Sequence, residues 1–107
     1  MLSYDDFSKL ELKIATVRAA ERVEGSEKLL KLAIDVGEEA ARTLVAGIGK
    51  RTTPEELIGT QIVIIANLEP RMLMGIESQG MLLATDGDDG PVLLRPEHPV
   101  KPGSGVH

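Results

Sequence analysis

The chain contains no cysteine, only two aromatic residues and no long apolar run. The missing cysteines exclude disulfides and thiolate metal sites. The longest apolar stretch, residues 62–66, is far too short to span a bilayer. With Tyr4 and Phe7 as its only aromatics, the chain lacks the usual platform on which single-stranded nucleic acids stack.

Length and charge set further bounds. The 107 residues predict a single domain, residues 1–107, large enough to bury a core without staples. The first residues lack the basic start and apolar middle of a secretory signal, so we expect a cytoplasmic protein. Lysine and arginine number 12 against 17 aspartate and glutamate residues, a net charge of −5. Nucleic-acid binding would therefore require a local basic patch on an acidic body.

Hydrophobic alternation and cap residues predict an all-β domain with two short helices. Alternating apolar residues favour strands. Ser3 can cap a short N-terminal helix, and Thr53 with Pro54 opens a second one. We expect a long loop over 68–79, a tight turn over 86–90 and a loop-like tail over 100–106. Strands are expected at 12–23, 29–36, 42–48, 61–67, 80–85 and 91–96.

A single short helix (53–59) between the third and fourth strands is the layout of an OB-fold, a five-stranded Greek-key barrel. Its usual ligand face is the outer surface of strands two and three with the neighbouring loops. We expect the acidic residues of 53–59 and 86–89 to lie elsewhere. The direction of Arg42 stays open, because Leu44 and Val45 both favour the interior. The ligand face would carry Lys28, Lys31, Lys50, Arg51 and residues 68–79.

Enzyme signatures fail on spacing. Gly75 lies one residue too far from Ser78 for a nucleophile elbow. A phosphate loop ending at Lys50 would need glycine where Leu44 stands. Two histidines with scattered acids give no metal cluster. We therefore expect no catalysis, no cofactor and no metal.

The segment PRMLMGIESQGMLLA (70–84) holds three of the four methionines around a polar stretch. Met72 would by default pack as core filler under a loop. Ser78 and Gln79 are harder to dismiss, because polar side chains between buried positions usually have hydrogen-bond partners. Lys28 and Lys31 read as ordinary solvated charges, except that Lys31 stands opposite a clean apolar stripe, on the expected ligand face.

Several stretches resemble one known family, the tRNA-binding domain of many methionyl-tRNA synthetases. The same domain also occurs in free-standing dimeric tRNA-binding proteins and in synthetase-associated cofactors. The match covers nearly the whole chain, and ANLEPRMLMGIESQGM is its most specific part. The other matching stretches are FSKLELKIATV, EKLLKLAIDVG, RTLVAGIGK, TPEELIGTQIVII and the closing VKPGSGV.

The resemblance implies recognition of tRNA mostly by shape and backbone. The lysine of the family's D-K-L element falls on Lys28, and its S-x-G-M element falls on Ser78 and Met81. Arg71 and Lys50 occupy positions that are commonly basic. Lys31 and Gln79 complete the set of residues that we expect to bind tRNA.

One departure from the family stands before the lysine. Where H-P-N-A-D is usual, this chain has VEGSE (23–27), so Gly25 replaces an asparagine. The change removes a side-chain donor next to the proposed site.

Family members of this size are typically homodimers, and the domain begins directly after Met1. We therefore expect a non-catalytic tRNA-binding homodimer, free-standing or serving a methionyl-tRNA synthetase by helping it to capture tRNA. The alternatives are a chaperone-like dimer that grips peptide through its apolar loop, and a domain that only assembles synthetase partners.

Overall fold

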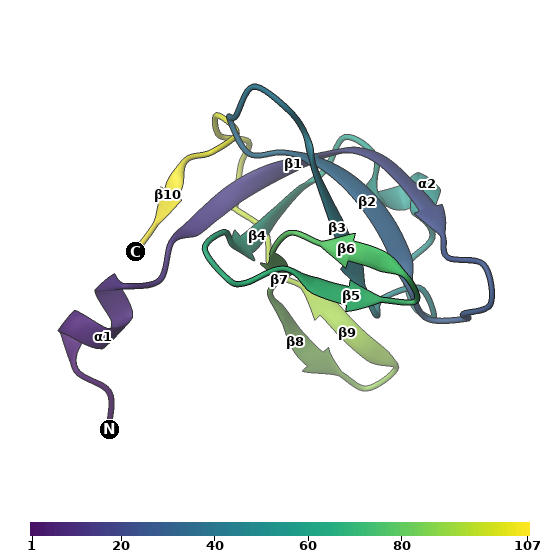
Figure 1. Ribbon diagram of the computed structural model, residues 1–107, viewed down its shortest axis with the longest axis horizontal. Helices are drawn as coiled ribbons and strands as arrows, with labels where there is room; N and C mark the ends of the chain where they lie inside the picture. The colour runs from purple at the N-terminus through teal and green to yellow at the C-terminus, as the bar shows by residue number, and fades with distance from the viewer.

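The computed structural model describes all 107 residues. Its longest strand, β1 (Leu12–Arg22), pairs with other strands on both sides. A register shift between Val17 and Ala19 bends β1. The first half of β1 pairs with β4 (Gln61–Ile65) and the second half with β2 (Leu30–Asp35), both antiparallel. One strand thereby serves both sides of the barrel (Figure 1).

The strand order is β3-β2-β1-β4-β7, where β3 is Arg42–Ala46 and β7 is Met81–Leu82. It forms a nearly closed, five-stranded antiparallel barrel, which confirms the predicted OB-fold. Two short hairpins lie outside this path. They are formed by β5 (Arg71–Leu73) with β6 (Ile76–Ser78), and by β8 (Ala84–Gly87) with β9 (Gly90–Leu93).

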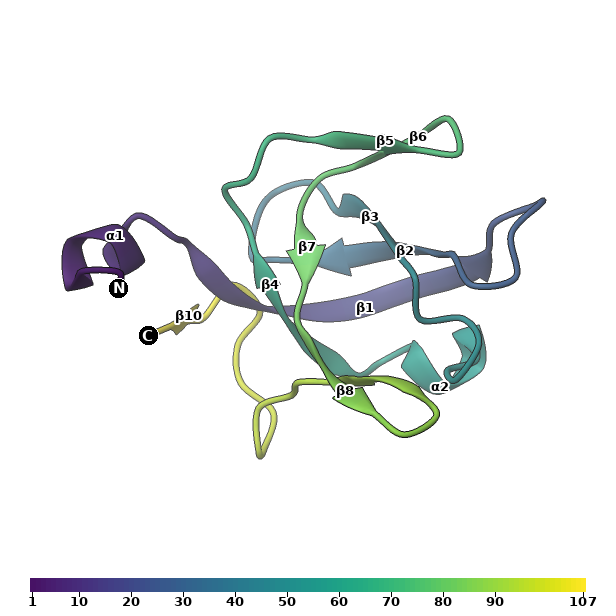
Figure 2. The ribbon, with the colours of Figure 1, turned by 90° about the horizontal axis from the view of Figure 1, so that it is seen from below.

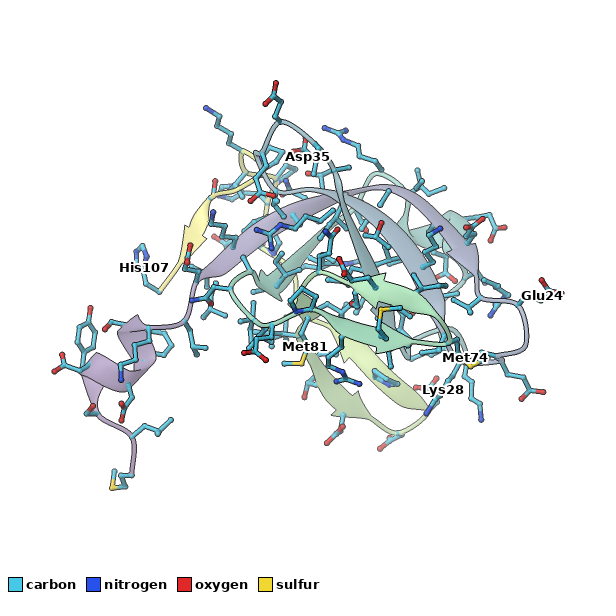
Figure 3. All side chains as sticks on the ribbon, viewed as in Figure 1. Glu24, Lys28, Asp35, Met74, Met81 and His107 are labelled. Carbon is cyan, nitrogen blue, oxygen red and sulfur yellow. The ribbon has the colours of Figure 1, made fainter.

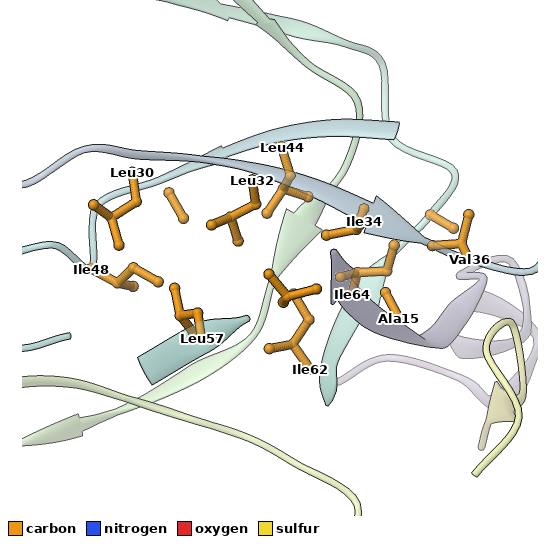
Figure 4. Close-up of a cluster of buried hydrophobic side chains, with 13 residues drawn as sticks. Ala15, Leu30, Leu32, Ile34, Val36, Leu44, Ile48, Leu57, Ile62 and Ile64 are labelled. Carbon is orange, nitrogen blue, oxygen red and sulfur yellow. The ribbon is translucent and has the colours of Figure 1, made fainter. Parts of the chain in front are cut away.

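Apolar and polar residues alternate along β2, and the apolar ones form part of the core. Leu30, Leu32 and Ile34 are fully buried, while the residues between them face outward. Residues from β3 and β4 meet them inside the barrel, and Leu57 closes one end (Figure 4). Burial of these aliphatic side chains supplies most of the driving force for folding.

Both helices begin where the cap residues predict. Helix α1 (Tyr4–Ser8) has Ser3 as N-cap, and helix α2 (Pro54–Leu57) has Thr53. Each forms a capping box, in which the cap hydroxyl accepts from a backbone N–H and a carboxylate three residues on accepts from the cap N–H. Both helices fall well short of the length and hydrophobicity that a membrane-spanning helix needs.

Two segments differ from the sequence-based prediction. The expected loop over 68–79 contains the β5–β6 hairpin, and the expected tail over 100–106 contributes β10 (Gly105–Val106), which pairs with β1. Strands this short bury too few side chains to show a periodicity in the sequence. The expected fifth strand over 80–85 is divided between β7 and β8.

Helix α1 projects from the barrel and buries none of its residues (Figures 1 and 2). It carries both aromatic residues of the chain, with Tyr4 79% exposed and Phe7 39% exposed. An apolar surface of this kind is available for a partner.

Candidate nucleic-acid interface

Hairpin β5–β6 lies over the outer face of β3. Its two-residue turn, Met74 and Gly75, has φ of +50° and +79°. Two consecutive left-handed residues match the twist of the flanking strands, so this turn closes a regular hairpin. The hairpin covers Val45 from outside, while Leu44 points into the core. Both residues are therefore buried, and the ambiguity in strand three is resolved.

Ser78 and Gln79 attach the hairpin to the barrel. The Ser78 hydroxyl accepts a hydrogen bond from the Val45 N–H at 3.0 Å and donates to the Gly80 carbonyl at 3.1 Å. Gln79 Oε1 accepts from the Thr43 N–H at 2.9 Å, and the Gln79 N–H donates to the Thr43 carbonyl at 2.8 Å. Side chains here satisfy the backbone of β3, which would otherwise be an unpaired strand edge.

A groove of about 680 Å³ runs between this hairpin and the barrel. Ten of its fourteen lining residues are hydrophobic, and the charged ones are Lys28 and Arg71. Figure 3 shows Met74 close to Lys28 at the tip of the hairpin and Met81 toward its base. The methionines that line the groove are Met72, Met74 and Met81.

The turn before β2 supports the tip of the hairpin. Gly25 has a φ of +84°, and a Cβ at this position would lie 3.4 Å from the Met74 methyl carbon. The turn is also held internally, because the Ser26 hydroxyl accepts from the Leu29 N–H at 3.1 Å. Lys28 therefore leaves from a fixed backbone at the mouth of the groove.

The loop after β3 places Lys50 beside Lys28. The Gly49 N–H donates to the Lys28 carbonyl at 2.6 Å, and Arg22 Nη1 donates to the Gly49 carbonyl at 2.9 Å. A Cβ on Gly49 would lie 3.0 Å from the Lys28 carbonyl oxygen, so this close approach favours glycine. Arg22 thus fixes the loop, a role that no sequence motif indicated.

A model of the family described as "Putative tRNA binding domain" matches residues 12–105. The chain belongs to this tRNA-binding domain family. The match spans every barrel strand, the β5–β6 hairpin and the groove beneath it.

Similar proteins include methionine–tRNA ligases, which are much longer than this chain, and solved structures of about its own length. Methionine–tRNA ligases of Methanothrix thermoacetophila and Thermotoga maritima are 49% and 52% identical to the chain, over 99% and 98% of its length. The chain spans only 16% of the length of each.

Two solved structures are covered almost completely. One is a MetRS related protein from Pyrococcus horikoshii, with a TM-score of 0.92, 37% identity and coverage of 100% of this chain and 98% of that one. The other is the chaperone CsaA from Bacillus anthracis, with a TM-score of 0.89, 34% identity and coverage of 100% and 99%.

Within the tRNA-binding domain, two of the predicted basic residues, Lys28 and Arg71, line the groove, and Lys50 follows Gly49 in the loop whose backbone is bonded to Lys28. Lys28, Lys50 and Arg71 are exposed, and none has a carboxylate within 4.0 Å. Unpaired cations at one place give a net negative molecule a local positive surface. Met81, 43% exposed, lines the same groove.

Two other cations of the expected face are engaged by acids. Lys31 projects from the outer face of β2 and pairs with Glu21 at 3.8 Å. Arg51 pairs with Asp89 at 3.2 Å. The acidic 86–89 turn therefore lies beside the basic loop, which corrects the expectation that it lies elsewhere.

Arg42 does not line the groove, because its guanidinium is engaged by Glu38 and by two backbone carbonyls. Its Nε and Nη2 donate to the two carboxylate oxygens of Glu38 at 2.8 and 2.7 Å, and Nη1 donates to the carbonyls of Ala66 and Gln79. The hydrogen bond from Arg42 holds the pKa of Glu38 below its ordinary value, and Glu38 in turn raises the pKa of Arg42. The Arg42 side chain thus connects β3 to the segments that follow β4 and β6.

Sequence reasoning placed one groove methionine wrongly. Met72, expected by default as core filler, is 64% exposed. The signal was present, since methionines gathered around a polar loop are typical of an adaptable binding surface. Ser78, expected to face tRNA, is 4% exposed, and its hydroxyl is already engaged on both sides.

Proposed function

We propose that this chain is a non-catalytic module that binds folded tRNA through the β5–β6 groove. The observation on which the proposal rests is that Lys28, in the turn before β2, and Arg71, on β5, line one groove, and neither has a carboxylate within 4.0 Å. In a molecule with a net charge of −5, such a cluster is what draws a polyanion to one place. Lys28, Lys50 and Arg71 contact phosphates, and Met81 contacts sugar or base.

The remaining site residues have supporting roles. Lys31 adds a weaker contact, because Glu21 competes for its charge. Ser78 positions the hairpin. Gln79 does the same through Oε1, while its Nε2 makes no hydrogen bond within the chain and is left for RNA.

The similarity to methionine–tRNA ligases suggests where the chain acts and with which enzyme. Since the chain resembles a small part of methionine–tRNA ligases, we place it with such an enzyme in the cytoplasm, where it increases the enzyme's hold on tRNA, either as a separate chain or as part of a longer one. Two copies would raise the avidity for tRNA through effective concentration. The exposed apolar side chains of α1 and its flanks, Leu2, Tyr4, Phe7 and Leu10, supply a surface on which two copies can associate.

The test is a titration of the chain with folded tRNA and with unstructured RNA of equal length at two salt concentrations. Three phosphate contacts give a log–log salt slope of about −2 to −3. Replacing Lys28 or Arg71 with alanine should lower affinity about five- to eightfold at 0.1 M salt, because each contact contributes a slope of about −0.7 to −0.9. Lys101→Ala, a change at an exposed lysine in the tail, should leave binding unchanged.

Equal affinity for unstructured RNA, or unchanged tRNA binding in both Lys28→Ala and Arg71→Ala, would overturn the proposal. Sedimentation equilibrium of the same preparations measures the association state. A Tyr4→Ser, Phe7→Ser double variant should shift any dimer toward monomer without altering binding per site.

A second candidate is peptide binding. It is favoured by the methionine-lined groove and by the likeness to a structure described as a chaperone. An unfolded polypeptide that competes with tRNA in a salt-independent manner would favour this candidate, because apolar contacts release no counterions.

A further inference from the structure

The methionines of the groove are exposed, although the barrel has a complete core of its own. Met72, Met74 and Met81 are 64%, 58% and 43% exposed, and no other part of the chain covers them. Contact with phosphates alone would not require such a surface, because phosphate and ribose are polar. The groove therefore offers an apolar contact that a regular RNA helix does not use.

RNA has one kind of apolar surface, the faces of its bases. Stacking hides these faces within a helix and exposes them where a nucleotide is splayed out of a loop, bulge or junction. A groove with thioethers on its wall and cations beside them matches such a nucleotide, whose base is apolar and whose neighbouring phosphates are charged.

On the basis of the proposed function, we propose that the groove takes one unstacked nucleobase of the bound RNA. The base face packs against Met72, Met74 and Met81, and Lys28 and Arg71 contact the phosphates on either side. The thioether sulfur is polarizable and makes favourable contacts with aromatic rings. It fills the place of the stacking aromatics that this chain lacks outside α1.

The lining also determines what the groove can distinguish. Lys28 and Arg71 are its only polar side chains, and both are donors. No side-chain acceptor is present to read a base amino group. The groove should therefore bind an unstacked base of any of the four kinds with similar affinity.

The direct probe is an RNA hairpin whose stem carries a single bulged 2-aminopurine. Matched RNAs carry no bulge, an abasic bulge, or each of the four ordinary bases. The base-containing bulge should bind at least about fivefold more tightly than the abasic one, the low end of what one stacked base contributes. The four bases should agree within about threefold, and 2-aminopurine fluorescence should change on binding.

Protein variants identify the groove as the place of contact. Met72→Gln and Met81→Gln keep chain length but introduce an amide, and each should lower affinity for the bulged RNA about threefold to tenfold. The loss should be smaller for the abasic RNA, which offers no base face. Met72→Leu and Met81→Leu retain apolar surface but lack the sulfur, so each should lose less affinity than the corresponding glutamine variant. Met1→Gln is the matched control, since Met1 lies outside the groove and is fully exposed.

The outcomes separate the two proposals. If tRNA binds in a Lys28-dependent manner but the abasic and base-containing bulges bind equally, the base pocket is overturned and the tRNA-binding function stands. If tRNA does not bind, both fail. If Met72→Gln weakens peptide binding and leaves RNA binding unchanged, the groove belongs to peptide and the base pocket is overturned.

Discussion

The hydroxyl of Ser78 accepts a hydrogen bond from the backbone N–H of Val45 at 3.0 Å. Both residues are buried, so no water replaces the bond when the hydroxyl is removed. Ser78→Ala should therefore destabilise the chain by about 1–3 kcal/mol, the cost of leaving a buried N–H unsatisfied. Urea denaturation measures this loss.

The same variant separates a structural role from direct contact with RNA. If Ser78 only positions the hairpin, the variant should bind tRNA more weakly because the hairpin is less ordered. Lowering the temperature should then restore most of the lost affinity. Unchanged stability with strongly reduced tRNA binding would instead show that the hydroxyl touches RNA, as the sequence motif suggests.

Removing the partner of Lys31 should improve binding. Glu21→Gln breaks an exposed ion pair of 3.8 Å, which contributes about 0–1 kcal/mol to stability and can be lost cheaply. The released lysine adds charge to the RNA-binding face, so affinity should rise and the salt slope should steepen by up to about 0.7–0.9. A titration series between 50 and 300 mM salt, roughly the range in which slopes are linear, measures both.

Glu39→Gln is the control for net charge, because it removes an equal charge from the exposed β2–β3 loop. An equal gain in both variants would assign the effect to overall charge and argue against Lys31 as a phosphate contact.

The barrel itself could be predicted from the sequence. The alternation of Leu30, Leu32 and Ile34 against polar neighbours identifies a strand buried on one face, and Thr53 with Pro54 marks a helix start. These signals lie within short stretches of sequence, so they can be read without knowing the tertiary structure.

The groove could be predicted only in part. Strand β3 does not alternate, because Leu44 is covered by the core and Val45 by the β5–β6 hairpin, and burial on both faces removes the period. Ser78 and Gln79 read as ligand contacts, since nothing local shows that β3 needs their oxygens. The pairing of Arg42 with Glu38 likewise depends on how the loop folds back.

Gly25 allows the family's asparagine to be restored. Asparagine is among the few residues that accept a positive φ, and its Cβ would meet only the flexible end of Met74, at 3.4 Å. Gly25→Asn should raise tRNA affinity about two- to tenfold if the amide donates to RNA, the range of one net hydrogen bond.

Gly25→Ala is the matched variant, since it adds a Cβ at the same φ without a donor. It should lose about 1 kcal/mol of stability and gain no affinity. Asparagine and alanine variants with equal affinity would show that the turn makes no side-chain contact with RNA.

Oxidation should impair binding, because methionine is the only residue of this chain with reversible sulfur chemistry. Hydrogen peroxide adds one oxygen to a thioether and leaves as water, which converts an apolar contact into a polar one. Mild treatment should weaken tRNA binding about threefold to tenfold as groove methionines are oxidised. Mass spectrometry of peptides identifies the sites, and anisotropy measures affinity.

A triple variant with leucine at 72, 74 and 81 should keep most of its tRNA affinity before this treatment and lose no more of it afterwards. Met1→Leu should remain sensitive. Equal loss of binding in the triple variant would place the sensitivity at Met1 or outside the protein.

Acid should weaken the fold through Glu38. Its pKa in the folded chain is lowered below 4.5, first by the hydrogen bond from Arg42, while the unfolded chain keeps the ordinary value. A lowered folded pKa means that the unfolded chain binds protons first, so the stability contributed by Glu38 is complete above about pH 5 and is lost as pH falls through the folded pKa. Asp35, whose pKa is lowered first by the Gly37 N–H and then by Arg18, acts in the same direction.

Thermal melts between pH 7 and pH 3 should therefore be flat at first and then fall. Glu38→Gln removes the charge but keeps a shape that can accept one hydrogen bond from Arg42, so this variant should be less stable at pH 7 and show a shallower acid decline. Because Arg42 also donates to the carbonyls of Ala66 and Gln79, loss of its partner loosens the end of the barrel next to β6. An acid decline in Glu38→Gln as steep as in the parent chain would exclude this carboxylate as the source and leave Asp35 and Glu56, whose pKa is lowered first by the Thr53 N–H, to account for it.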